Sequence, residues 1–449
     1  MTPSLASALN RIRDDFAAVL APASLRQLCT QIGHSWRQRT LDPITTIHLF
    51  VLQILHRNTA CAHLPRITGR AFSASAYCQA RARLPLGLLE QLLDALVAAT
   101  KPLVDSGRWR GHRTWLVDGT GVSLPDTPEL QRAFGQPTNQ TPGCGFPVAR
   151  ILALFHAGTG LLTKILVTPL RSHEAAHVTG MHPALESGDV LVGDSAFGTL
   201  AHLAHLLERG LHGVFRLSAR RVVDFTPNRP HPPRWNGPTA TGLPRSRWVR
   251  SLGREDQVVE WVRGYQRPPW MTQKAFAALP VTITVRELRY SVARPGFRVR
   301  SVTLVTTLLD PVAYPADALA DLYRSRWRVE TNLAHWKTTL GMDALHCQTE
   351  AGVRREMVMF AVVYNLVRIV MAEAGQRQGI EPDRISFVDA LRWLSSAPPG
   401  APMPAFIVNP ERKDRIEPRC LKRRAKKYPY MIRPRHVLRK ELQGQGVAS

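Results

Sequence analysis

Residues 114–120 read TWLVDGT, and residues 189–197 read DVLVGDSAF. In each stretch a short apolar run, typical of a buried strand, ends at an acid, Asp118 in the first and Asp194 in the second. Between them, apolar runs at 149–155 and 161–167 are separated by a Gly-Thr-Gly segment, which predicts a hairpin. The chain order is therefore strand, strand, strand, helix (173–186), strand, and a helix (199–209) and a strand (213–217) follow. This alternation predicts an α/β fold rather than an all-helical one.

The N-terminal quarter of the chain has a different pattern. Apolar residues recur with helical spacing over 41–56 and 86–99, so residues 1–108 are predicted to be helical. Between these helices, the stretch 72–84 carries Arg81 and Arg83. We interpret it as an ordinary capped helix with exposed arginines, and a helix that contacts DNA is the alternative.

Residues 219–310 interrupt the α/β alternation. The part from 220 to 270 is rich in Pro, Arg and Trp, with ten Arg against four acids, and 281–309 is rich in β-branched residues. We interpret the segment as a β-rich insertion, with a separate linked domain as the alternative. Helices are predicted again at 316–340 and 353–374. The expected organisation is an N-terminal helical domain (1–108), an α/β core in two parts (109–218 and 311–375), the insertion (219–310) and a basic C-terminal region (376–449).

The composition favours a globular protein with a polyanionic partner. Of 449 residues, 44% are hydrophobic and 21% charged, which is ordinary for a folded chain. The 59 Lys and Arg residues exceed the 34 Asp and Glu residues, giving a net charge of +25. The tail at 412–440 has 13 basic residues and two acids, so it is either a solvated segment or one that follows a phosphate backbone.

Cysteine spacing and hydropathy point away from a secreted or membrane protein. The six cysteines are scattered and none forms a C-x-x-C pair, which argues against a zinc knuckle or a disulfide framework and fits a reducing cytosol. The N-terminus lacks a signal-peptide pattern. The most apolar segment, 357–371, is too short to span a bilayer.

Four polar residues in the stretch 316–340 share one spacing pattern. Tyr323 is followed by Arg326, Glu330 and Lys337 at offsets of 3, 7 and 14 residues. On a regular helix these side chains fall within an arc of about 60°. A carboxylate would then lie beside two cations and a phenol. A structural salt-bridge stripe is the alternative, since Glu and Arg pairs at this spacing are common on helices.

The two acids at strand ends suggest a cation site. A carboxylate at the end of a buried strand is costly unless it is paired. Small neighbours (Gly119, Gly193, Ser195 and Ala196) leave room for a substrate to approach. If Asp118, Asp194 and Glu330 converge, their repulsion requires a cation, and hard oxygen ligands favour Mg²⁺ or Mn²⁺ over zinc.

Together these motifs resemble the DDE transposases of bacterial insertion sequences, specifically the insertion-sequence-four group. That group is marked by a helix with Tyr, two residues, Arg, three residues, Glu, six residues and Lys, which matches Tyr323 to Lys337 without a gap. Asp118 and Asp194 match the contexts of the group's two aspartates, with separations of 76 and 136 residues along the chain to Asp194 and Glu330. The long second separation fits the group's β-rich insertion, and 423–442 is similar to its basic C-terminus.

The resemblance implies an RNase H-like (retroviral-integrase-like) core in which Asp118, Asp194 and Glu330 bind two Mg²⁺ or Mn²⁺ ions. Arg326 and Lys337 would hold phosphates, and Tyr323 would position the DNA backbone. The implied partners are double-stranded DNA at the element's terminal inverted repeats, target DNA, and a second copy of the chain, with no membrane. The implied setting is the bacterial cytoplasm, at the nucleoid.

The implied reaction is metal-dependent cut-and-paste transposition, with cleavage through a DNA hairpin and strand transfer into a target. The N-terminal helical domain would bind DNA. A flipped base could be held by one of the four insertion tryptophans, Trp235, Trp248, Trp261 and Trp270, although core packing is the favoured interpretation for each.

Two other functions are compatible with the same residues. One is an RNase H-like nuclease without strand transfer, and the other is a non-catalytic DNA-binding protein derived from a transposase. His202 and His205, three residues apart, could bind a metal, but packed or exposed histidines are the favoured interpretation. The sequence contains no P-loop and no G-x-S-x-G motif, so nucleotide hydrolysis and esterase chemistry have no support.

Overall fold

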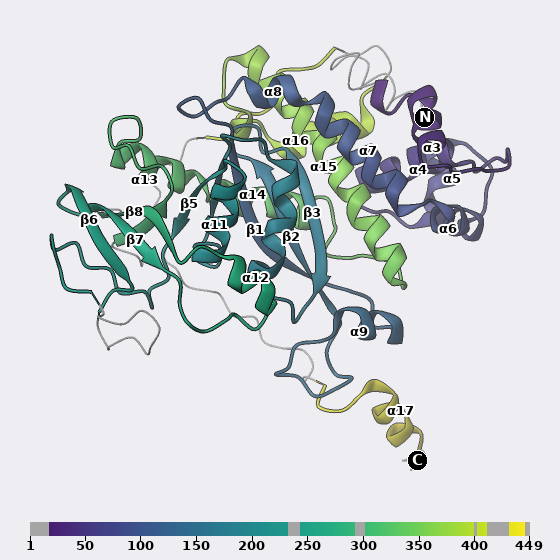
Figure 1. Cartoon of the computed structure of the whole chain (residues 1–449). Helices are drawn as coiled ribbons and strands as arrows, with labels where there is room; N and C mark the ends of the chain where they lie inside the picture. The colour runs from purple at the N-terminus through teal and green to yellow at the C-terminus, as the bar shows by residue number, and fades with distance from the viewer. Residues whose placement is uncertain (1–17, 232–242, 292–300, 399–401, 411–430, 445–449) are drawn as a thin grey trace.

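One mixed β-sheet organises the chain (Figure 1). The computed structural model describes residues 18–231, 243–291, 301–398, 402–410 and 431–444. Within these residues nine strands follow the order β3-β2-β1-β4-β5-β9-β8-β7-β6. The strands are β1 (Thr114–Ser123), β2 (Val148–His156), β3 (Leu162–Pro169), β4 (Val190–Gly193), β5 (His212–Arg216), β6 (Ser246–Gly253), β7 (Asp256–Val262), β8 (Thr282–Ser291) and β9 (Ser301–Thr306). This arrangement confirms the predicted α/β class.

The first five strands form an ordered unit. β1, β2 and β3 pair antiparallel, and the predicted hairpin is β2–β3. β4 pairs parallel with β1 on one side and with β5 on the other. The connection between β3 and β4 contains a short helix, α10 (Glu174–His177), followed by a 3-10 segment, η2 (Val178–Ala184), instead of the single predicted helix. Pro183 inside η2 lacks the N–H that a continuing α-helix requires.

β1 is longer than its apolar run predicts. It continues past Asp118 to Ser123, because β2 pairs with it along its whole length. The parallel partner β4 pairs only with 114–116. The prediction that the strand ends at Asp118 is therefore wrong, but Asp118 does lie where β1 loses its β4 neighbour, and Asp194 directly follows β4.

The segment predicted as a β-rich insertion extends the same sheet. β9 pairs antiparallel with β5, and β8, β7 and β6 continue outward from it. The strands β8 and β9 match the predicted β-branched stretch, whereas β6 and β7 come from the Pro- and Arg-rich half. A short helix, α12 (Gln273–Ala278), connects β7 to β8. The remaining helices within the α/β part are α9 (Pro128–Phe134) and α11 (Leu200–Glu208).

The predicted long helix at 316–340 is divided. It forms α13 (Ala316–Ser325), α14 (Arg328–Ala334) and a π-helical turn, η3 (His335–Thr339). Between α13 and α14 the backbone stays right-handed, but amides 326, 327, 329 and 330 bond to carbonyls three residues back rather than four. One tightened turn and one widened turn therefore replace the regular spacing on which the arc of Tyr323, Arg326, Glu330 and Lys337 was predicted.

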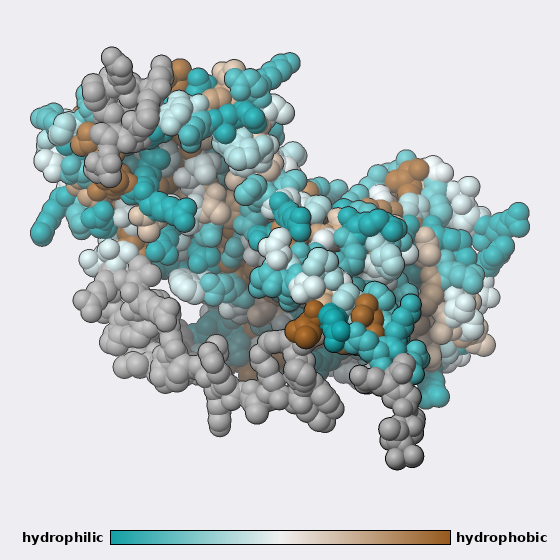
Figure 2. Space-filling view, turned by 90° about the horizontal axis from the view of Figure 1, so that it is seen from below, coloured by the Kyte–Doolittle hydropathy of each residue, from teal (hydrophilic) through white to brown (hydrophobic). Residues whose placement is uncertain are grey.

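The most apolar helix lies in the middle of the molecule. α15 (Glu350–Gln378) has 29 residues, so it is long and apolar enough to cross a membrane by length and composition, contrary to the prediction from 357–371. Its most apolar window is 94% buried inside the protein. Asn365 and Tyr364 bond the backbone of the β2–β3 hairpin at Leu162 and Gly160, so this helix packs on the sheet as a core element. The face of the molecule seen in Figure 2 is largely hydrophilic.

Helices from both ends of the chain surround α15 (Figure 1). The N-terminal ones confirm the predicted helices at 41–56, 72–84 and 86–99. They are α3 (Pro22–Gln31), α4 (Pro43–Leu55), η1 (Cys61–His63), α5 (Leu64–Thr68), α6 (Ala74–Arg83), α7 (Leu86–Ala99) and α8 (Lys101–Asp105). The C-terminal ones are η4 (Pro382–Arg384), α16 (Phe387–Ser396) and α17 (Arg435–Gly444). Most of the basic tail lies outside the described residues.

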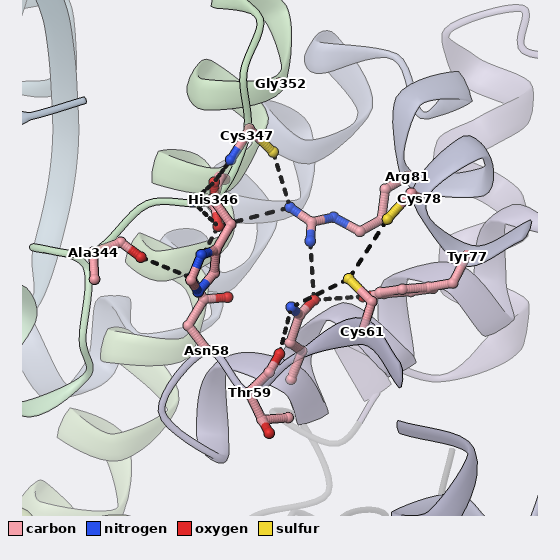
Figure 3. A network of polar contacts seen from close by, with 12 residues as sticks. Asn58, Thr59, Cys61, Tyr77, Cys78, Arg81, Ala344, His346, Cys347 and Gly352 are labelled. Carbon is pink, nitrogen blue, oxygen red and sulfur yellow. Dashed lines mark hydrogen bonds and ion pairs between the residues drawn. The ribbon is translucent and has the colours of Figure 1, made fainter. Parts of the chain in front are cut away.

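A buried arginine joins the N-terminal helices to α15 (Figure 3). The Arg81 side chain is only 8% exposed and lies 3.8 Å from the fully buried Glu356 of α15. It also donates to Gln53 at 3.0 Å and to the sulfur of Cys347 at 3.2 Å, and it stacks over Phe50. Arg81 is therefore a structural residue, and the alternative in which it contacts DNA is wrong, whereas Arg83 is exposed as predicted.

We expect Arg81→Met to lower the free energy of unfolding by about 3 kcal/mol, because the change leaves the Glu356 carboxylate buried without its cation. Urea denaturation of the full chain measures this change. The control is Arg83→Met on the same helix, whose exposed side chain should cost less than about 0.5 kcal/mol. Equal stabilities for the two variants would contradict the role given to Arg81.

Candidate active site

Asp118 lies half-buried on the face of β1 that α13 and α14 cover. Burial raises the pKa of this carboxyl to about 6, and the nearby carboxylates of Asp194 and Glu174 raise it further, against the hydrogen bond from the Gly119 amide and the charge of Arg326. The Gly119 amide donates to Asp118 Oδ1 at 2.8 Å. Asp118 is thus an acid whose ionised form is poorly stabilised without an added cation.

Arg326 connects two of the predicted site acids. Its Nη1 lies 3.5 Å from Asp118 Oδ2, and its Nη2 lies 3.8 Å from Glu330 Oε1. The two acids are 212 residues apart in sequence, yet one guanidinium bridges them. The Arg326 Nε is buried without a hydrogen-bond partner among the described residues. Arg326 therefore supplies the positive charge between the two carboxylates in this structure.

Tyr323 lies beneath Arg326. Its ring is buried and lies 5.8 Å from the Arg326 guanidinium carbon, so it supports the arginine. Burial raises the pKa of the Tyr323 hydroxyl, with a further contribution from Asp194, whereas Arg326 and Arg216 act in the opposite direction. The electrostatic effect of Asp194 on both Tyr323 and Asp118 indicates that this second acid lies at the same end of the sheet.

Asp194 begins a tight turn directly after β4. Its Oδ1 accepts a hydrogen bond from the Ala196 amide at 2.8 Å, and the chain then enters α11 at Thr199. The Phe197 side chain is fully buried in this turn. Its ring lies where a Cβ on Gly193 would be, so the small residue at 193 accommodates protein rather than a substrate.

Lys337 reaches β1 from the π-helical turn. Its Nζ donates to the Thr120 hydroxyl at 3.0 Å and to the Gly121 carbonyl at 2.7 Å. Thr120 shares the strand face of Asp118, because alternate residues of a strand point the same way. Lys337 therefore contacts the strand that carries Asp118, despite the irregular helix between it and Arg326.

The six predicted site residues gather around one end of β1 and β4. Glu330 is the most accessible of the acids, with 51% of its side chain exposed. Among the described residues, however, no group of three or more His, Cys, Asp or Glu side chains lies close enough together to hold a metal ion. The carboxylate donors suit a hard divalent cation by chemistry. As they lie, Arg326 neutralises them instead.

An acid that the sequence gave no reason to select lies next to this group. A Cβ on Gly119 would lie 2.3 Å from Glu174 Oε1, so the Glu174 carboxylate fills the space that was predicted to admit a substrate. Arg150 of β2 holds Glu174 at 2.8 Å. We had interpreted Glu174 only as an acid at a helix start. No local signal reveals its proximity to Asp118, because β2, β3 and a turn separate them.

The remaining candidates have structural surroundings. Trp261 is fully buried, donates to Glu287 at 2.7 Å and stacks with Arg221, so it is a core residue. Trp248 and Trp270 are half-buried, and Trp235 lies outside the described residues. His202 is buried and bonds His182, while the half-exposed His205 contacts Glu208, so His202 and His205 do not form a metal pair.

Known proteins share this combination of sequence and sheet. Residues 109–366 match the family model described as "Transposase DDE domain". The chain therefore belongs to the DDE transposases, as the motif resemblance predicted.

Its relatives are members of the IS4 group. The chain is 25% identical over 374 residues to the transposase InsG for insertion sequence element IS4 of Escherichia coli, covering 79% of this chain and 78% of that protein. It is 23% identical to the putative transposase InsZ of the same species over 222 residues, covering 49% and 68%. The piggyBac transposase synaptic complex with hairpin DNA is similar at a TM-score of 0.41 and 9% identity, covering 88% of this chain and 79% of that chain.

The raised pKa of Asp118 predicts a pH-dependent stability. A carboxyl whose pKa is higher in the folded state stabilises the fold below about pH 4, and this contribution is lost as pH rises through about 6. Asp118→Asn should therefore raise the metal-free unfolding free energy by about 2 kcal/mol at pH 7.5, and by progressively less towards pH 4. Urea denaturation at several pH values measures this gain. A gain that is constant with pH would contradict the assigned environment.

Proposed function

We propose that this transposase cleaves DNA at the ends of its insertion sequence and joins those ends to a target. The observation that carries the proposal is the Arg326 guanidinium, which bridges Asp118 and Glu330 beside the turn that bears Asp194. Acids from three distant parts of the chain thus approach one another at a sheet edge. A structural salt-bridge stripe on one helix does not account for the contact with β1.

Asp118, Asp194 and Glu330 would hold Mg²⁺ or Mn²⁺, two ions in the full site. Their oxygen ligands and the poorly stabilised charge of Asp118 fit such cations. Bound ions would supply activation of a water or 3′-hydroxyl and stabilisation of the leaving oxygen. Because Arg326 contacts two of the three acids, its guanidinium would leave one or both of them and turn towards DNA phosphate when the cations are present.

Arg326, Lys337 and Tyr323 would position the DNA backbone. Arg326 offers a planar fork with a buried, unpartnered Nε, and it rests on the Tyr323 ring. Lys337 offers a point charge at β1, three strand positions or fewer from Asp118. Both cations thus lie within reach of a phosphate that is bound at the acids.

The sheet supports an RNase H-like (retroviral-integrase-like) core made of β3-β2-β1-β4-β5, with the acids at the end of the central strands. We propose the division into an N-terminal DNA-binding domain (1–108), a two-part core (109–218 and 311–375), an insertion (219–310) and a basic C-terminal region (376–449). The net charge of +25 supports double-stranded DNA as the partner, both the terminal inverted repeats and the target. We further propose action as a homodimer on DNA at the bacterial nucleoid, through a hairpin intermediate.

The three acids test the cleavage step. We expect Asp118→Ala, Asp194→Ala and Glu330→Ala each to abolish Mg²⁺-dependent cutting of the element's ends, because each removes a cation ligand. Gel assays with end-labelled DNA measure cleavage, and mobility shifts measure binding, which should persist. Arg83→Met is a matched control that should cleave normally. Near wild-type cleavage by all three alanine variants would rule out the proposed site.

Strand transfer is tested separately. Pre-cut element ends mixed with a supercoiled target plasmid and Mg²⁺ should give joined product with the wild-type chain and none with Glu330→Ala. Cleavage of intact ends without any joining of pre-cut ends would favour an RNase H-like nuclease. Tight binding with neither reaction, in Mg²⁺ or Mn²⁺, would favour a non-catalytic DNA-binding protein.

A further inference from the structure

Two histidines are buried beneath the turn that bears Asp194. His202 of α11 and His182 of η2 are each 2% exposed, and their Nε2 atoms lie 3.0 Å apart. The other ring nitrogen of His202, Nδ1, lies 2.8 Å from the carbonyl oxygen of Phe197. The two imidazoles and the turn therefore form one connected chain of hydrogen bonds.

The direction of this chain follows from its last acceptor. A carbonyl only accepts, so His202 Nδ1 carries a hydrogen and donates it to Phe197. The neutral ring then has its lone pair on Nε2, and His182 Nε2 must be the donor to it. Burial lowers the pKa of His182 to about 4 and that of His202 to about 3, so both rings are neutral near pH 7. Each ring is thereby held in a single tautomer.

The hydrogen bonds end on the backbone of the Asp194 turn. The Phe197 amide lies 3.3 Å from the Asp194 carbonyl, and the Phe197 carbonyl also accepts from the Thr199 amide at 2.8 Å. The Phe197 ring packs against Gly193, the residue before Asp194. Fixing the Phe197 carbonyl thus fixes the segment from 193 to 199 against α11.

Packing alone does not explain the two imidazoles. Burying polar rings in a core costs free energy unless their nitrogens are bonded, and an aliphatic side chain would fill the space without that cost. The site above has a need that the histidines meet. Asp194 and Asp118 carry like charges that destabilise each other without a cation, so the turn requires a rigid support to keep Asp194 at the site.

We propose that His182 and His202 are positioning residues that hold the Asp194 turn in the geometry needed for cation binding. This inference rests on the proposed function, since it takes Asp194 as a cation ligand. Neither histidine touches DNA or the reacting atoms. His182 acts on His202, His202 acts on the Phe197 carbonyl, and the turn transmits the effect to Asp194.

Substitutions at 202 separate the donor from the packing. Asn places its amide nitrogen near the position of His Nδ1, whereas Gln places its amide near Nε2, and Leu fills the space without a donor. We expect His202→Leu to weaken Mn²⁺ binding by about tenfold or more, a size typical of residues that orient metal ligands. His202→Asn should bind Mn²⁺ nearly as well as the wild type, and His202→Gln should bind it weakly. His182→Leu should be intermediate.

Mn²⁺ binding to the full-length chain is measured by electron paramagnetic resonance titration without DNA, so the readout does not depend on cleavage. Affinity for the element's ends should be unchanged in every variant. His205→Ala on the same helix is the control, because its half-exposed ring lies outside the hydrogen-bonded chain.

Equal Mn²⁺ affinity in wild type and His202→Leu would overturn the inference and leave the proposed function intact. If the Leu variant does not fold, the Asn and Gln variants decide, and equal affinities for those two would overturn it. Failure of the wild-type chain itself to bind Mn²⁺ would overturn the proposed function together with this inference.

Discussion

The rest of the site depends on one electrostatic constraint, the repulsion among carboxylates that the fold brings to the end of β1 and β4. Without a counter-charge, Asp118 would be destabilised by burial and by its acidic neighbours. Arg326 meets this need through its contacts with Asp118 and Glu330, and Tyr323 supports the guanidinium from below. The tightened turn between α13 and α14 positions Arg326 for both contacts. The irregular helix is thus part of the site's electrostatics.

Much of the fold could be predicted from local pattern. Apolar runs and a Gly-Thr-Gly turn predicted the β2–β3 hairpin, and helical spacing predicted α4, α6 and α7. The motif from Tyr323 to Lys337 identified the family because its residue types and spacing are rare in combination. These successes share one cause, which is that the determining residues are close together in sequence.

Features set by distant contacts could not be predicted. β1 continues past Asp118 because β2 pairs with it, and nothing within β1 reveals that pairing. Glu174 fills the space at Gly119 after a chain reversal through two strands. His202 was compared with His205, its neighbour in sequence, whereas its partner His182 comes from the preceding connection. The break at 326–327 likewise lies in a stretch whose side chains favour an uninterrupted helix.

The contact between Arg81 and Glu356 also has a consequence for how the protein is made. A chain leaves the ribosome from its N-terminus, so α3 to α8 emerge long before α15. Those helices pack on α15, and Arg81 finds its buried carboxylate there, 275 residues later in the sequence. A nascent chain that stops short of residue 378 therefore exposes apolar surface on its first helices. Their native packing is completed only near the end of translation.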